Sequence, residues 1–125
     1  MNRKARILLV DDDADFVAAT KKILESKSWE VIVASNGEDG VAKARSESPD
    51  LILLDMMMPV KDGFLAAKDL KTDSKVSKIP VLALTSFNQN LGDPFEIHVD
   101  EYIQKTITPA QLLEKVQGHL KKLGF

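Results

Sequence analysis

The sequence predicts an α/β protein: a doubly wound, five-stranded parallel sheet with helices on both faces. Short apolar runs alternate repeatedly with segments of helical periodicity, which is typical of strand–helix repeats. The runs are almost wholly aliphatic, as expected of strands that are buried on both faces. The chain has 125 residues, the size of one domain with one core, so we expect a single domain over residues 1–125.

Five apolar runs are the expected strands. Right-handed crossovers between them would make all the strands parallel, so that their carboxyl ends form one edge of the sheet. Ligands of open α/β sheets bind at this edge. The runs are Ala5–Val10, Val31–Ala34, Leu51–Leu54, Pro80–Leu84 and a weaker one, Tyr102–Gln104.

The first two helices are expected directly after the first two strands. Asp13 is the expected N-cap of the first helix, and Asn36–Asp39 resembles the capped start of the second. The second helix would turn Val41 and Ala44 toward the core. The residues at helical spacing in the first helix are Phe16, Thr20, Ile23, Leu24 and Lys27.

Two further helices follow the third and fifth strands. Phe64–Leu70 comes after the turn-forming pair Asp62-Gly63 and predicts a third helix. Thr108–Gln111 combines a capping box with a proline at the first helical position, and so begins the last helix. The expected apolar face of the last helix is Leu113, Val116, Leu120 and Leu123.

Composition excludes several classes of function. Lys and Arg number 17 and Asp and Glu 19, a net charge of −2, which gives no basic surface for nucleic acid or an anionic membrane. The chain has no cysteine, which removes disulfides, thiolate nucleophiles and cysteine-based metal centres. The two histidines, His98 and His119, lack metal-ligand spacing. No apolar run is long enough to span a bilayer or to serve as an export signal, so we expect a cytoplasmic protein.

Polar residues stand at the carboxyl ends of four expected strands. Asp11-Asp12-Asp13 follows the first strand, Asp55 the third, Thr85 the fourth and Lys105 the fifth. Converging carboxylates repel one another unless a cation lies among them, and a few carboxylates with open positions for phosphate oxygens is the usual Mg²⁺ arrangement. One carboxylate could then attack phosphorus while the ammonium neutralises the phosphoryl oxygens. The pattern therefore predicts phosphoryl transfer onto an aspartate.

Taken singly, some of these residues have simpler roles. Asp13 is expected to cap a helix rather than to bind metal, and Lys105 alone would be a surface charge. Asp55 is harder to explain in this way, because it interrupts an apolar stretch in which a lone buried carboxylate would be costly.

Together the motifs resemble the receiver domains of two-component response regulators, over Lys4 to about Leu123. A flavodoxin-like strand order of 2-1-3-4-5 is taken from this family, whose chemotaxis member is a known example of it. The motifs are Ile7–Asp13, Leu53–Pro59 with Asp62-Gly63, Leu84–Ser86 and Tyr102–Lys105.

The resemblance implies a role for each matching residue. Asp55 would accept phosphate from a phosphohistidine on a sensor histidine kinase or a histidine phosphotransfer protein. Mg²⁺ would be bound directly by Asp12, Asp55 and the backbone carbonyl of Met57, and through water by Asp11. Thr85 would contact a phosphoryl oxygen and Lys105 would pair with the phosphoryl charge. Thr85 and Tyr102 would form the switch that alters the binding of a downstream target protein.

The chain departs from the family pattern at several positions. Thr106 replaces the usual proline after Lys105, and His98-Val99 replaces a usual Gly-Ala pair. Met57 and Phe87, two residues beyond Asp55 and Thr85, are apolar and cannot position a hydrolytic water by hydrogen bonding. Between Asn88 and Val99, Gly92 and Pro94 disfavour a regular helix, so we expect the family's fourth helix to be short or irregular. Partner recognition would then shift toward the last helix, with Lys115, Lys121 and Lys122.

Two alternatives stay open at this point. A degenerate receiver would bind partners without being phosphorylated, and the changes around Thr106 favour it. A small haloacid-dehalogenase-type phosphatase would use Asp11 as its nucleophile, but it leaves Asp55 unexplained. As a receiver, the chain would catalyse only its own phosphorylation and dephosphorylation. With no effector segment after Phe125, output is expected to pass through a partner protein unless the chain is part of a larger regulator.

Overall fold

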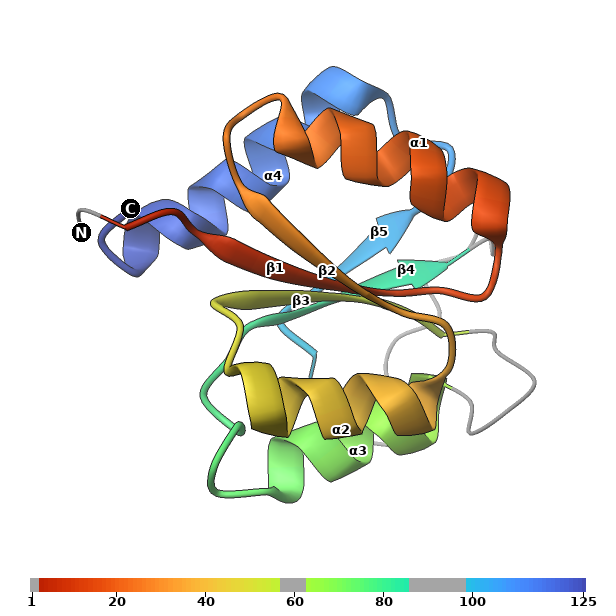
Figure 1. Ribbon diagram of the computed structural model, residues 1–125, viewed down its shortest axis with the longest axis vertical. Helices are drawn as coiled ribbons and strands as arrows, with labels where there is room; N and C mark the ends of the chain where they lie inside the picture. Colours follow the sequence, from red (N-terminus) through yellow and green to blue (C-terminus); the bar gives the residue numbers. More distant parts are fainter. Residues whose placement is uncertain (1–2, 57–62, 86–98) are drawn as a thin grey trace.

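The structure, a computed structural model, describes residues 3–56, 63–85 and 99–125, in which five strands and four helices form three layers (Figure 1). All strands are parallel and lie in the order β2-β1-β3-β4-β5, which confirms the predicted fold class and order. The strands are β1 (Arg6–Val10), β2 (Glu30–Ala34), β3 (Leu51–Asp55), β4 (Val81–Thr85) and β5 (Glu101–Gln104); the helices are α1 (Ala14–Glu25), α2 (Gly37–Glu47), α3 (Gly63–Thr72) and α4 (Pro109–Lys122).

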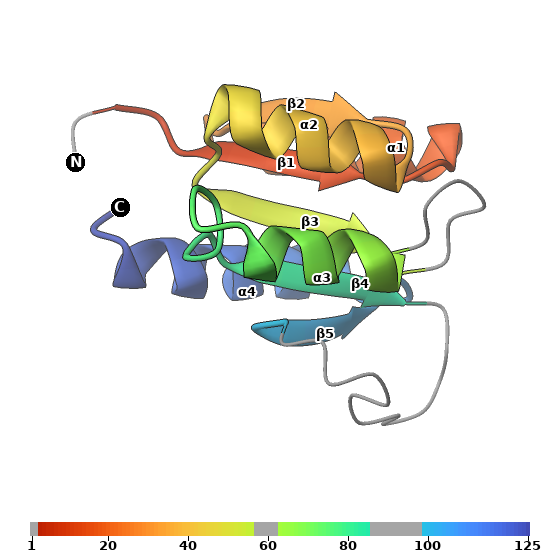
Figure 2. The same ribbon diagram turned by 90° about the horizontal axis from the view of Figure 1, so that it is seen from below.

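The sheet is covered on both faces, by α1 and α4 on one side and by α2 and α3 on the other (Figures 1 and 2). Successive strand side chains point to opposite faces, so each strand contributes to both halves of the core. In β3, Leu51 and Leu53 pack toward α1 and α4, whereas Ile52 and Leu54 pack toward α2 and α3. All four are fully buried, which explains why this strand reads as an unbroken aliphatic run.

The predicted helix caps are confirmed. Asp13 accepts hydrogen bonds from the backbone N–H groups of Asp15 and Phe16, at 3.0 and 3.2 Å. Asn36 accepts one from Asp39 at 2.8 Å, and Thr108 and Gln111 form the reciprocal capping box. Each cap satisfies backbone donors that the first turn leaves unpaired, and so fixes where its helix begins.

Two strands are longer at their carboxyl ends than the apolar runs predict. Asp55 is the last residue of β3, in register with Leu84, and Thr85 is the last residue of β4, in register with Gln104. Backbone pairing does not depend on side-chain polarity, so the ladder continues through the polar residues. The side chains of Asp55 and Thr85 are therefore carried by strand backbone, whereas Asp11, Asp12 and Lys105 belong to the segments that follow β1 and β5.

The buried face of the last helix agrees with the prediction at Val116 and Leu120 and differs from it at Leu113 and Leu123. Leu112, Val116 and Leu120 are buried against the sheet, while Leu113 is only partly buried. Leu123 is the C-cap and is 37% exposed. A spacing of four residues keeps the three buried side chains in one row, and Leu113 lies to one side of that row.

The first helix also ends sooner than its periodicity predicts. It stops at Glu25, so Lys27 lies beyond it and is exposed. Ser28 has a φ of 63°, a left-handed conformation that cannot continue a helix.

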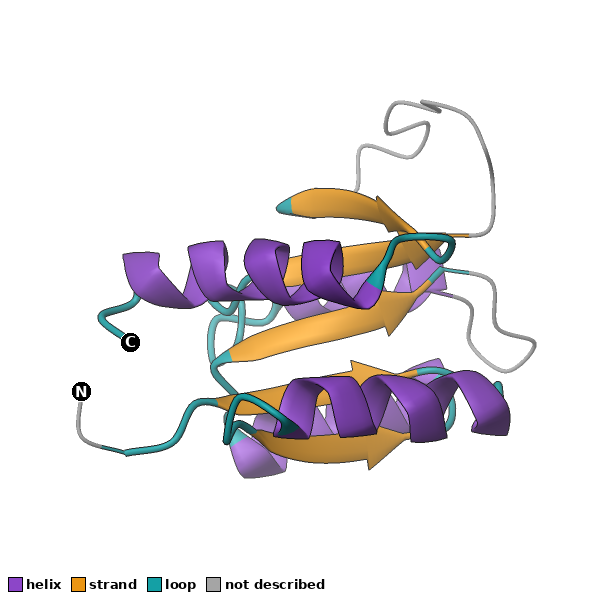
Figure 3. Cartoon of the chain, turned by 90° about the horizontal axis from the view of Figure 1, so that it is seen from above, coloured by secondary structure: helices purple, strands orange, loops and turns teal. Residues whose placement is uncertain are grey.

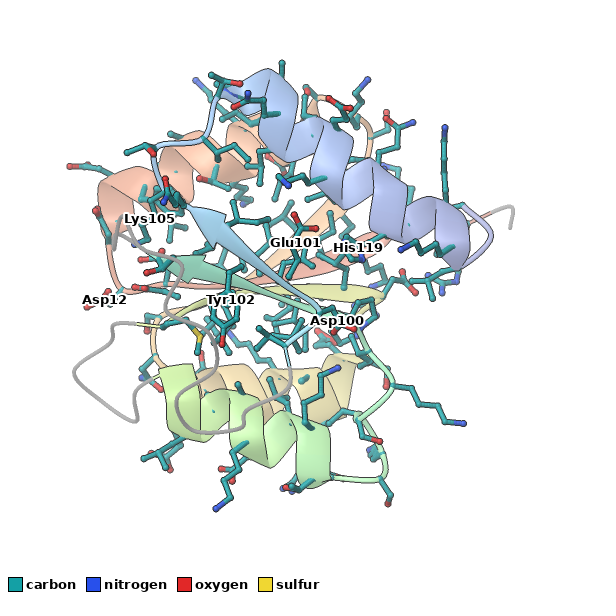
Figure 4. The ribbon with its side chains drawn as sticks, turned by 180° about the vertical axis from the view of Figure 1, so that it is seen from behind. Asp12, Asp100, Glu101, Tyr102, Lys105 and His119 are labelled. Atoms are coloured by element: carbon teal, nitrogen blue, oxygen red, sulfur yellow. The ribbon has the colours of Figure 1, made fainter. Side chains whose placement is uncertain are left out.

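A charged cluster ties β5 to α4. Glu101 accepts a hydrogen bond from Lys115 and lies 3.0 Å from Nε2 of His119 (Figure 4). Burial works to raise the pKa of Glu101, but these two partners outweigh it and the pKa lies below its usual value. Lys115, expected on the outer polar side of the last helix, is thus paired with the sheet.

Several predictions fall outside the described residues. They are the backbone carbonyl of Met57 as a metal ligand, the apolar side chains of Met57 and Phe87, and the irregular helix after Asn88. Among the helices that the structure describes, none is long and apolar enough to cross a membrane.

Candidate functional site

The strands all end at one edge of the sheet (Figure 3), and the predicted polar residues gather there. Asp11 follows β1 directly, Asp55 and Thr85 end β3 and β4, and Lys105 follows β5. Side-chain alternation gives Asp11, Asp55 and Lys105 the orientation of Leu9, Leu53 and Ile103, toward the face covered by α1 and α4.

Three carboxylates form a compact acidic cluster at this edge. One oxygen from each of Asp11, Asp12 and Asp55 lies within 4.8 Å of the others. Asp11 and Asp55 are 1% and 2% exposed, and Asp12 is exposed and opens the cluster to solvent. The arrangement is that of a cation site with one accessible side.

Asp11 is held in place by its neighbours. Its backbone N–H donates to the carbonyl of Ala34 at 3.0 Å, and its Oδ1 accepts from the backbone N–H of Asp13 at 2.9 Å. Its Oδ2 is buried and accepts no hydrogen bond from any described residue. A buried carboxylate oxygen of this kind requires a positive charge nearby.

Lys105 supplies that positive charge. Its Nζ lies 2.9 Å from Oδ2 of Asp11, without the direction of a hydrogen bond, and 3.4 Å from Oδ2 of Asp55. Burial of the ammonium group works to lower the pKa of Lys105, but the two carboxylates outweigh it and the pKa lies above its usual value. Lys105 is therefore charged at neutral pH and partly neutralises the cluster.

The aromatic ring of Phe16 completes the surroundings of Lys105. The Nζ of Lys105 lies 4.6 Å from the ring centroid, within the range of a cation–π contact. Helical spacing indicated only a core-facing role for Phe16. No local spacing indicated the contact with Lys105, because the lysine follows β5, far from Phe16 in the sequence.

Thr85 lies at the end of β4, and Tyr102 lies in the neighbouring strand β5. Thr85 is buried, and its carbonyl accepts the backbone N–H of Lys105 at 2.8 Å, which fixes the lysine beside β4. Tyr102 is 41% exposed and faces the side opposite Ile103. Figure 4 shows Asp12 and Lys105 at the same end of the sheet, with Tyr102 on β5.

A comparison with protein-family models matches residues 7–117 to the response regulator receiver domain. The chain belongs to this family. The match extends from β1 into α4, and so includes every strand of the sheet, the acidic cluster, Thr85 and Lys105.

Curated relatives of this receiver domain include two bacterial proteins. The alkaline phosphatase synthesis transcriptional regulatory protein PhoP of Bacillus subtilis is 36% identical over 126 residues, covering 98% of this chain and 50% of the relative. Protein PilH of Pseudomonas aeruginosa is 36% identical over 118 residues, covering 93% and 98%. The chain thus spans about half the length of PhoP and of several other relatives, and nearly the whole of PilH.

Solved structures agree with this assignment. A CheY-like response regulator receiver domain protein from Methanospirillum hungatei is 30% identical, with a TM-score of 0.87 over 96% of each chain. The chain therefore has both the fold and the sequence of a receiver domain of two-component signalling.

Proposed function

We propose that residues 1–125 form one phosphoacceptor receiver domain and that Asp55 is the residue that takes the phosphoryl group. The observation that carries the proposal is the buried Asp55 carboxylate, which lies within 4.8 Å of Asp11 and Asp12 and 3.4 Å from the Lys105 ammonium. A nucleophilic carboxylate needs compensating positive charge to approach an anionic phosphoryl group, and this edge of the sheet provides it.

The acidic cluster suits Mg²⁺. Its donors are carboxylate oxygens, Asp12 keeps one side open, and the buried Oδ2 of Asp11 accepts no hydrogen bond among the described residues. Asp12 and Asp55 would bind the ion directly, with Asp11 acting through water. When bound, Mg²⁺ neutralises charge on the transferring phosphoryl group.

The transfer uses groups that this chain holds in place. A carboxylate oxygen of Asp55 attacks phosphorus, an O–P bond forms, and the P–N bond of a phosphohistidine on a partner kinase or phosphotransfer protein breaks. The leaving imidazole keeps the electron pair of that bond and takes a proton from solvent. Lys105 offsets the negative charge of the phosphoryl oxygens, and the Thr85 hydroxyl donates to one of them.

The output follows from the same geometry. Thr85 moves toward the phosphoryl group, and Tyr102 on the adjoining strand changes its position in response, which alters a surface read by a downstream protein. The exposed Tyr102 in β5, the strand that pairs with β4, supports this coupling.

Intact mass spectrometry tests the proposal. After incubation with acetyl phosphate and Mg²⁺, the wild type should gain the mass of one phosphoryl group, and Asp55→Asn should not. Asp13→Asn is the matched control, because Asp13 caps α1 outside the acidic cluster. A wild-type mass that stays unchanged, under conditions that preserve acyl phosphates, would instead favour a degenerate receiver that acts only by binding partners.

A further inference from the structure

We propose that Phe16 is a positioning residue for phosphoryl transfer, because its ring holds the Lys105 ammonium over the acidic cluster. This inference rests on the proposed function of Asp55 and adds to it a residue that contacts neither metal nor phosphate. Phe16 acts through Lys105, so it changes how often the ammonium occupies the position in which it faces the phosphoryl group.

The ammonium of Lys105 has neighbours of two kinds. The carboxylates of Asp11 and Asp55 lie 2.9 and 3.4 Å from Nζ, and the Phe16 ring centroid lies 4.6 Å from it. The Lys105 side chain is 20% exposed, so the contact is largely shielded from water. Cation–π attraction strengthens as the interacting groups are desolvated. The ring therefore attracts the ammonium electrostatically, in addition to packing against the lysine side chain.

The position of the ring is set by the segment that carries the acidic residues. Phe16 lies in the first turn of α1, where its backbone N–H donates to Oδ1 of Asp13 at 3.2 Å. The N–H of Asp13 in turn donates to Oδ1 of Asp11 at 2.9 Å. One hydrogen-bonded turn therefore fixes both the buried carboxylate and the ring, and Lys105 is held between them.

The ring differs from the carboxylates in a way that matters during the reaction. Asp11 and Asp55 are negatively charged and are shared with any cation that enters the cluster, so their hold on Lys105 weakens when Mg²⁺ binds. The ring of Phe16 is neutral and does not bind Mg²⁺. It remains to restrain the long, flexible lysine side chain at the moment when the phosphoryl group arrives.

Variants at position 16 separate the face of the ring from its bulk. Phe16→Leu keeps an apolar side chain against the core but removes the π face, and Phe16→Tyr keeps that face. Replacing Phe16 with pentafluorophenylalanine preserves the shape of the ring and reverses its quadrupole. At saturating Mg²⁺, the initial rate of phosphorylation by acetyl phosphate should fall about 2- to 10-fold in the leucine and pentafluoro variants and stay near wild type in the tyrosine variant.

A spectroscopic readout accompanies the rates. The ε-methylene protons of Lys105 should be shifted upfield by the ring in the wild type and in Phe16→Tyr, and should move toward ordinary lysine values in Phe16→Leu. Thermal unfolding of each variant shows whether α1 still packs against the sheet. Because the pentafluoro ring keeps the planar shape of phenylalanine and is slightly larger, a slower rate in a variant with unchanged unfolding cannot come from lost packing.

The outcomes are distinguishable. If the leucine and pentafluoro variants are phosphorylated as fast as the wild type, the positioning role of Phe16 is contradicted and the proposed function stays intact. Equal slowing in all three variants, tyrosine included, would also contradict it, because the π face would then be irrelevant. A wild type that takes no phosphate contradicts the proposed function itself.

Discussion

Three consecutive aspartates at the end of β1 have three different surroundings. Asp11 is buried and faces Lys105, Asp12 is exposed at the mouth of the acidic cluster, and Asp13 caps α1. Identical side chains thus differ in role: Asp11 forms an ion pair, Asp12 is a proposed metal ligand, and Asp13 starts a helix. The differences come from strand alternation and from the point at which the helix begins.

Alanine variants of Asp12 and Asp13 should therefore affect different properties: the first Mg²⁺ affinity, the second folding stability. Asp12→Ala should weaken Mg²⁺ binding strongly and, measured without Mg²⁺, should not lower the unfolding free energy. Asp13→Ala should lower the unfolding free energy by about 1 kcal/mol, because α1 loses its cap, and should leave Mg²⁺ affinity nearly unchanged. Isothermal titration with Mg²⁺ and urea unfolding of both variants measure the two effects. Equal losses of Mg²⁺ affinity would show that the cluster has been assigned in the wrong register.

The sequence predicts the individual residues of this site better than their contacts. Asp55 stands out because a carboxylate interrupts an aliphatic run, and Asp13 because a capping residue precedes a helical pattern. The contact between Phe16 and Lys105 is not encoded in any local spacing, since it depends on α1 packing on the sheet face toward which the Lys105 side chain points. The burial of Asp11 depends likewise on its hydrogen bond to Ala34 at the end of β2.

At the scale of elements, α3 begins in direct contact with the site. A Cβ added at Gly63 would lie 2.4 Å from the carbonyl oxygen of Asp55 and 2.3 Å from the Cα of Met56. Backbone atoms cannot move aside as a flexible side chain can. Only glycine permits α3 to start this close to the end of β3, so the start of the helix helps to set the position of Asp55.

Replacing Gly63 with alanine should disturb both fold and site. We expect Gly63→Ala to lower the unfolding free energy by about 1–3 kcal/mol and to slow phosphorylation of Asp55. Gly118→Ala on α4 is the matched control, since a Cβ there would meet no described atom within 4 Å. It should raise the unfolding free energy by about 0.5–1 kcal/mol. Urea unfolding compares the two variants. An unchanged unfolding free energy in Gly63→Ala would show that the close approach of α3 to the end of β3 is not required.

The opposite edge of the sheet is held by Asp50, just before β3. Its carboxylate accepts hydrogen bonds from the backbone N–H of Arg6 at 2.7 Å and from the guanidinium of Arg3 at 2.8 and 2.6 Å. Burial works to raise the pKa of Asp50, but these partners outweigh it and the pKa lies below its ordinary value of 3.8. The charged form of Asp50 therefore stabilises the folded state.

The sign of this pKa shift fixes a pH dependence. Because the folded pKa is lowered, the stabilisation is fully present above about pH 5 and is lost as the pH falls through the folded pKa. Asp50→Asn keeps an acceptor for Arg6 but removes the charge, so it should unfold at lower urea concentration than the wild type at pH 7. The difference between the two proteins should shrink below pH 4. A difference that stays constant down to pH 2 would assign the effect to something other than ionisation.

For the whole molecule, the alternation of strands and helices predicts the fold class because it depends only on local periodicity. The order of the strands is a long-range property that no single segment encodes, and it could be predicted only through the resemblance to a family. The buried face of α4 is predicted correctly at Val116 and Leu120, but the sequence pattern selects Leu113 in place of its neighbour Leu112, because both are leucines on the same side of the helix. Packing against the sheet decides between them.

The acidic edge should also couple global stability to metal. Clustered carboxylates repel one another in the folded protein, and Mg²⁺ binding to the folded state alone raises the unfolding free energy, by about 2.7 kcal/mol at a hundredfold excess over Kd. Without Mg²⁺, Asp55→Asn should melt at a higher temperature than the wild type, because it removes one of the mutually repelling charges. Adding Mg²⁺ at constant ionic strength should raise the wild-type melting temperature clearly and that of Asp55→Asn much less. Equal increases in melting temperature on adding Mg²⁺ would show that the ion binds outside the acidic cluster.

The central claim is that Asp55 carries the phosphoryl group, and locating the acyl phosphate tests it most directly. Borohydride reduces an aspartyl phosphate to homoserine, which peptide sequencing by mass spectrometry assigns to one position. After reaction with acetyl phosphate and Mg²⁺, we expect homoserine at position 55 and nowhere else. Homoserine at position 11 would contradict the account in favour of a phosphatase-type nucleophile. Its absence from the whole chain, with a phosphorylated control protein reduced in parallel, would contradict phosphorylation altogether.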